Sequence, residues 1–135
     1  MSYRGYDLGF ILPVDKPFGP TSHDVVKALR RELGVSKVGH TGTLDPFASG
    51  LLLMCVGQLT RLSEYLVGLD KSYEATALLG TSTDTEDLHG NVIAESNAWK
   101  NLTTDAVQEV LVSLRGDIEQ VPPQFSAKKI KGVAM

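Results

Sequence analysis

Hydrophobic residues recur with two different periods in the first half of the chain. The short apolar run 10–14 predicts a strand, and Pro13 places it at a sheet edge or strand end because proline donates no ladder hydrogen bond. Valines and leucines then recur at helical spacing over 22–33, where Thr21 and Ser22 offer an N-cap. The continuous apolar run Leu51–Val56 predicts a buried strand.

The second half alternates between shorter elements. The pattern predicts a helix over 59–66, a strand over 72–79, an acidic turn over 81–90 with its hairpin partner at 91–94, a helix from Thr103 to Gly116 and a last strand over 126–130. This order lacks the regular βαβ rhythm of doubly wound folds. We therefore expect an α+β fold with a mixed, largely antiparallel sheet and flanking helices.

Composition and charge restrict the function only partly. The 135 residues are 42% hydrophobic and carry a net charge of −3, which argues against a strongly basic nucleic-acid binder. The charge is uneven, however: +1 over residues 1–65 and −4 over 66–135, so a local basic surface stays open. A cytoplasmic protein without membrane contact is expected, because the chain shows neither a signal peptide nor an apolar run near the roughly 20 residues of a membrane helix.

The most informative segment is the loop predicted over 39–50. It has no hydrophobic period and contains three glycines, and long loops inside a domain are often functional. Asp45 lies in it before Pro46, which favours extended backbone at the carboxylate. Asp45 is a candidate nucleophile, general base or metal ligand, while an Asx-turn or a helix cap is the ordinary alternative. No second carboxylate is close in sequence, so a two-acid or metal-dependent hydrolase gains no local support.

Other polar residues have ordinary explanations when each is considered alone. His40 fits a hydrogen-bonded loop residue, Tyr73 a core aromatic and Lys16 a solvated side chain in a Pro/Gly turn. Residues 34–41 partly match a phosphate-binding loop, but His40 stands where that loop requires lysine. Cys55 fits a buried inert thiol, and one cysteine with three scattered histidines makes a zinc site an unfavoured explanation.

Four segments taken together are far more specific. Residues 39–46, GHTGTLDP, with the ASGLL that follows at 48–52, resemble the signature loop of the TruB family of tRNA pseudouridine synthases. Three more segments agree with that family in order and spacing: KPFGPTS at 16–22, KSY at 71–73 with the acidic turn after Gly80, and QVPPQFSA at 120–127. Thr41 stands where the guide-RNA enzymes usually carry serine, which favours the bacterial stand-alone type.

The resemblance implies roles for individual residues. Asp45 would attack the target uridine, His40 would fill the space that the flipped base vacates, and Tyr73 would stack on the flipped uracil. The remaining candidate substrate- or RNA-binding positions are Arg61, Lys16, Gly42 and Thr43. The implied reaction converts uridine to pseudouridine at position 55, in the T-arm loop of tRNA. It requires no metal, cofactor or obligatory protein partner.

The resemblance also implies that residues 1–135 form the N-terminal part of a catalytic domain. Family members continue with the rest of the catalytic sheet, an arginine that pairs with the catalytic aspartate, a second tyrosine and usually an RNA-binding PUA domain. This pseudouridine synthase fold would therefore be incomplete here. The alternative function is a catalytically incomplete RNA-binding fragment of such an enzyme.

Overall fold

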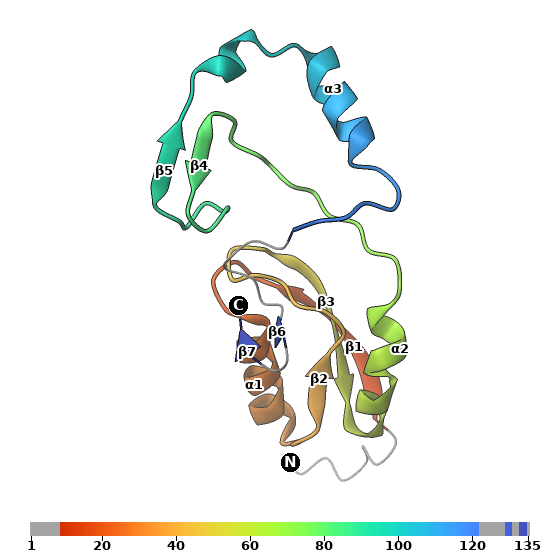
Figure 1. Ribbon diagram of the computed structural model, residues 1–135. Helices are drawn as coiled ribbons and strands as arrows, with labels where there is room; N and C mark the ends of the chain where they lie inside the picture. Colours follow the sequence, from red (N-terminus) through yellow and green to blue (C-terminus); the bar gives the residue numbers. More distant parts are fainter. Residues whose placement is uncertain (1–8, 122–128, 131–132, 135) are drawn as a thin grey trace. The chain divides into compact units, whose positions relative to one another are not determined.

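The computed structural model describes residues 9–121, 129–130 and 133–134 (Figure 1). The chain divides into two units, Met1–Tyr73 and Glu74–Met135. Both units combine helices with antiparallel strands. The predicted α+β class with a largely antiparallel sheet is confirmed.

The first unit is built on a three-stranded antiparallel sheet. Its strands are β1 (Phe10–Lys16), β2 (Val38–His40) and β3 (Gly50–Val56), in the order β1-β3-β2. The central strand β3 pairs along the whole of β1, from Phe10 opposite Val56 to Lys16 opposite Gly50. Consequently the end of β1 and the start of β3 share one end of the sheet, whereas the shorter β2 ends at His40, opposite Met54 of β3. The edge position predicted from Pro13 is confirmed, since β1 is an outer strand.

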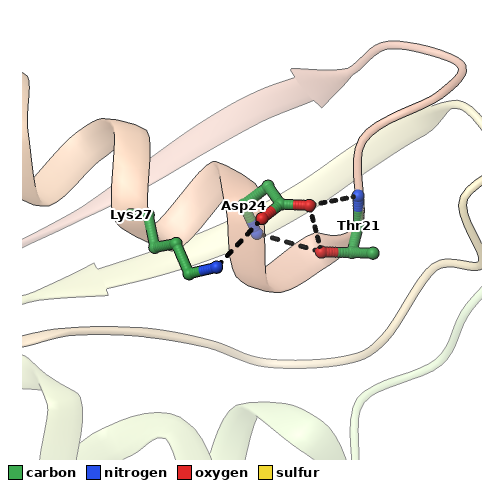
Figure 2. A network of polar contacts seen from close by, with 3 residues as sticks. All are labelled: Thr21, Asp24 and Lys27. Carbon is green, nitrogen blue, oxygen red and sulfur yellow. Dashed lines mark hydrogen bonds and ion pairs between the residues drawn. The ribbon is translucent and has the colours of Figure 1, made fainter.

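Helix α1 (Ser22–Leu33) has the predicted bounds and a complete set of end signals. The Thr21 side chain accepts a hydrogen bond from the Asp24 backbone, and the Asp24 carboxylate accepts from the Thr21 backbone, which is a capping box (Figure 2). Lys27 adds an ion pair to Asp24 at 3.2 Å. Gly34 ends the helix in the left-handed conformation, with φ 65°.

One face of α1 and one face of the sheet form the core of this unit. The buried residues are Val25, Val26, Val38, Leu52, Met54 and Val56. Cys55 is also fully buried, and burial raises the pKa of its thiol, which fits the predicted inert role. After β3 the chain continues through the 3-10 helix η1 (Gly57–Leu62) and the short helix α2 (Ser63–Val67), which together replace the single helix predicted over 59–66.

The second unit contains a small hairpin and one longer helix. Strands β4 (Thr81–Thr83) and β5 (Val92–Glu95) pair antiparallel, followed by η2 (Ala98–Asn101) and α3 (Thr104–Ser113). The pair of short strands β6 (Lys129–Ile130) and β7 (Val133–Ala134) comes last. In the acidic turn, hydrogen bonds from the Thr85 hydroxyl and the His89 backbone lower the pKa of Asp87. The apolar side of α3 remains exposed to solvent, as at Val110 and Leu111.

Three predicted elements need correction. The strand over 72–79 is wrong: residues 71–78 pair with no strand in the described chain, and the β-ladder begins only at Thr81. Strand β2 was not predicted, because it occupies the first residues of the segment assigned to the loop. Of the strand predicted over 126–130 only 129–130 is described, and the rest lies outside the described residues.

Two features are absent from the residues that the structure describes. No helix there is both long and apolar enough to span a bilayer. Within 9–121 and the two short strands that follow, no three histidine, cysteine or carboxylate side chains come together as a metal site would require.

Candidate functional site

The loop that carries Asp45 connects β2 to β3 and spans residues 41–49. Its first residue extends the ladder, since the Thr41 backbone donates to the Leu53 carbonyl at 3.0 Å. A tight turn follows at Asp45, whose carbonyl accepts from the Ala48 backbone at 3.0 Å. Pro46 occupies the second position of this turn, which its fixed φ favours.

A fully buried lysine holds the part of this loop that follows Asp45. Lys16 is the last residue of β1 and is 0% exposed, so the expectation of a solvated side chain is wrong. Its ammonium donates to the carbonyls of Ala48 at 2.6 Å, Pro17 at 3.0 Å and Pro46 at 3.3 Å. Because all three donors of a lysine can be satisfied in this way, the buried charge is offset by carbonyl dipoles. Lys16 thus fixes the loop directly after Asp45.

A buried serine holds the residue that precedes Asp45. Ser22, the first residue of α1, donates to the Leu44 carbonyl at 3.0 Å and accepts from the Leu44 backbone at 2.9 Å. The Gly19 backbone also donates to the Pro46 carbonyl, at 2.8 Å. The residues before and after Asp45 are therefore both tied to the turn that joins β1 to α1.

Within the described residues, Asp45 is positioned by its neighbours in the sequence and not by contacts of its own carboxylate. The residue is exposed, and its carboxylate accepts no hydrogen bond from the part of the chain that the structure describes. The Asx-turn and cap alternatives both require such a bond. The arrangement is a free carboxylate on a rigid turn, which suits a reactive group.

A pocket of about 340 Å³ lies beside the loop. Its lining comes from residues 41–44, from 51–53 of β3, and from Leu66 and 69–73 at and after α2. The volume lies within the ~300–1,000 Å³ usual for small-ligand sites. Gly42, Thr43 and Tyr73 are thus brought together as predicted site residues. Tyr73 is 72% exposed at this pocket, so its interpretation as a core aromatic is wrong.

The remaining predicted residues are absent from the lining of that pocket. His40 ends β2, is half-buried, and its Nδ1 is buried with no hydrogen-bond partner among the described residues. Arg61 lies exposed in η1. Asp45 follows directly after Leu44, the last lining residue of the loop.

Two residues hold the Asp45 loop in place, and the sequence did not identify either of them in this role. Lys16 was a candidate for RNA binding, and Ser22 only part of a cap. The signal for Lys16 was its position at the end of an alternating strand, where a buried face continues. The signal for Ser22 was the capping box, which assigns the cap to Thr21 and leaves the next hydroxyl free for another partner.

Comparison with known proteins identifies relatives over most of the chain. Residues 30–135 match the family model described as "TruB family pseudouridylate synthase (N terminal domain)". The chain is 48% identical over 122 residues to a tRNA pseudouridine synthase B of Geobacillus thermodenitrificans and 52% identical over 122 residues to one of Symbiobacterium thermophilum. Each alignment covers 90% of this chain and 40% of the relative, so the chain spans about two fifths of their length.

The fold also has a counterpart among solved structures. A chain in the crystal structure of a Cbf5-Nop10-Gar1 complex aligns with a TM-score of 0.59 and 30% sequence identity. The alignment covers 92% of this chain and 32% of that one. Since the family model alone matches well over half of the sequence, the chain belongs to the TruB family of pseudouridylate synthases.

Proposed function

We propose that the chain is the N-terminal part of the catalytic domain of a tRNA pseudouridine synthase, with Asp45 as nucleophile. One observation carries this proposal: the Asp45 carboxylate has no hydrogen-bond partner among the described residues, while Ser22 and Lys16 fix the backbone on either side of it. A nucleophile gains most when its position is set before the substrate arrives. The family membership and the named relatives support the reaction type.

The reaction is an isomerisation that leaves the composition of the nucleotide unchanged. The bond between N1 of uracil and C1′ of ribose breaks, and a bond between C5 and C1′ forms. C5 loses a proton and N1 gains one. A transient covalent bond to the Asp45 carboxylate lets the uracil detach and turn over before it reattaches. No metal or cofactor takes part in this scheme.

The pocket beside the loop suits the base in that scheme. Its leucines, from β3 and from the segment around α2, would cover a flat uracil ring, and the exposed Tyr73 offers a stacking surface. Stacking on an aromatic side chain contributes ~1–3 kcal/mol per base. The Nδ1 of His40, which has no partner in the described part of the chain, supports a polar contact with the RNA from which the base has been extruded.

The substrate in this proposal is the uridine at position 55, in the T-arm loop of tRNA, and the compartment is the cytoplasm. The names of the relatives support tRNA as the substrate class. The chain spans 40% of the length of those relatives. A C-terminal part would therefore supply the aspartate's cationic partner, further sheet strands and a PUA domain. The same coverage favours the second candidate, an RNA-binding fragment that is inactive by itself.

Tritium release from a T-arm stem-loop labelled at C5 of uridine tests this proposal. The chain is assayed alone and fused to the remaining C-terminal part of the Geobacillus relative. We expect turnover in the fusion, its loss in Asp45→Asn with RNA binding retained, and unchanged turnover in Glu32→Gln, an exposed carboxylate on α1. Turnover by Asp45→Asn at the parent rate would refute the assignment. RNA binding without turnover by the chain alone would favour the second candidate, and absence of turnover in the fusion as well would contradict the catalytic assignment.

A further inference from the structure

Lys71 is a charged residue of the pocket to which no role has been assigned. It lies just after α2, and it lines the same pocket as the loop residues 41–44. Its Cε would lie 3.7 Å from a Cβ built on Gly42, so its aliphatic stem lies against the loop. Lys71 therefore forms part of the pocket wall that faces Gly42.

The Lys71 ammonium is held in place by the backbone. It donates to the carbonyls of Val67 at 2.5 Å and Leu69 at 2.9 Å, near the C-terminal end of α2. A lysine has three donors, so one N–H remains for another acceptor. Within the described residues no carboxylate forms an ion pair with this ammonium, although Asp70 also lines the pocket. The site thus has an exposed positive charge that two carbonyls hold in place and that forms no ion pair within the described residues.

The chemistry of the pocket indicates the ligand for this charge. Leucine side chains and Tyr73 offer apolar surface for a base, and Lys71 adds a cation to the same wall. A nucleotide combines these two features, since its planar base is attached through the ribose to an anionic phosphate. We propose that Lys71 binds a backbone phosphate adjacent to the nucleotide whose base enters the pocket. This proposal rests on the proposed function of the site.

If Lys71 had a purely structural role, a different experimental result would be expected. Cations near the end of a helix stabilise its last carbonyls, and Lys71 does so for the five-residue helix α2. A residue with only that role would affect stability but not the number of ions released when RNA binds. A phosphate contact, in contrast, contributes about 0.7–0.9 to the slope of log K against log salt concentration.

The test measures how the binding constant for a T-arm stem-loop RNA depends on salt. Filter binding to the full chain is carried out at KCl concentrations from about 50 to 200 mM. In Lys71→Gln we expect the slope to become shallower by about 0.7–0.9. Lys71→Arg, which keeps the charge and the donors, should retain the parent slope. Lys27→Gln is the matched control, because Lys27 lies on α1, pairs with Asp24 and does not line the pocket.

A neutral methylphosphonate linkage beside the target uridine identifies the phosphate. It should weaken binding by the parent chain and have no further effect in Lys71→Gln, since both changes remove the same contact. An unchanged slope in Lys71→Gln, or equal losses in the Gln and Arg variants, would overturn the phosphate contact while leaving the proposed function intact. If the parent chain binds no RNA by itself, the slopes are measured in its fusion to the C-terminal part, and absence of RNA binding by that fusion would overturn both proposals.

Discussion

Replacing Lys16 by methionine tests whether this buried ammonium holds the loop that carries Asp45. Methionine has a similar length but no donors, so the carbonyls of Pro17, Pro46 and Ala48 all lose a hydrogen bond. The Pro46 carbonyl keeps its bond from Gly19. The other two acceptors are left without this partner in a site where the lysine is fully buried.

The expected loss of stability follows from the two shorter bonds. Hydrogen bonds to charged groups contribute roughly 1.5–3 kcal/mol each, so their removal costs about 3–6 kcal/mol. The methionine does not have to desolvate a charge, which offsets part of that cost. We therefore expect a net loss of about 2–4 kcal/mol, a large share of a typical total of ~5–15 kcal/mol.

Urea unfolding followed by circular dichroism measures this loss. With a slope near 2 kcal/mol per molar urea, the midpoint should fall by about 1–2 M. Lys27→Met is the control: this lysine is exposed and has only an ion pair at the surface, so the midpoint should change by little. A Lys16→Met midpoint within about 0.3 M of the parent would refute the reasoning, since an ammonium so easily replaced cannot be the anchor of the loop.

Three further predictions concern other contacts. Ser22→Ala removes both bonds to Leu44, so stability should fall by about 1–2 kcal/mol in urea unfolding and the Leu44 amide should exchange its hydrogen faster. Hydrogen bonds from Thr21 lower the pKa of Asp24 from 3.8 to about 2. The carboxylate therefore stabilises the fold fully above pH ~4, and this contribution is lost as the pH falls towards 2. The unfolding midpoints of the parent and of Asp24→Asn should converge over that range. In Gly80→Ala, at φ 88°, the new methyl group would clash with the Trp99 ring. The unfolding midpoint reported by tryptophan fluorescence should therefore fall. An unchanged midpoint would contradict the placement of that ring.

Local signals predicted the first unit well. Helix α1 could be bounded to the residue because its cap, its apolar spacing and its terminal glycine all agree. Strand β3 was identified because a continuous apolar run is typical of a strand covered on both faces. In contrast, β2 has three residues and gains its order from pairing with β3, which no local pattern reveals.

The failures have physical causes too. The alternation over 72–79 fits a strand, but alternation gives only a preference for extended backbone, and a strand also needs a partner. At the site, the loop and its aspartate could be selected from the sequence. The residues that hold the loop could not, because Lys16 and Ser22 act on backbone carbonyl and amide groups about 20 to 30 positions away.

The shared acceptor at Pro46 has a consequence for grafting parts between family members. Its carbonyl receives both the Lys16 ammonium and the Gly19 amide, so the segments 16–22 and 41–49 are built as one piece, although they are separate in sequence. Transplanting the nucleophile loop by itself would bring in carbonyls shaped for a different lysine and turn. The smallest portable unit of this site is the pair of segments together, exchanged as a single cassette.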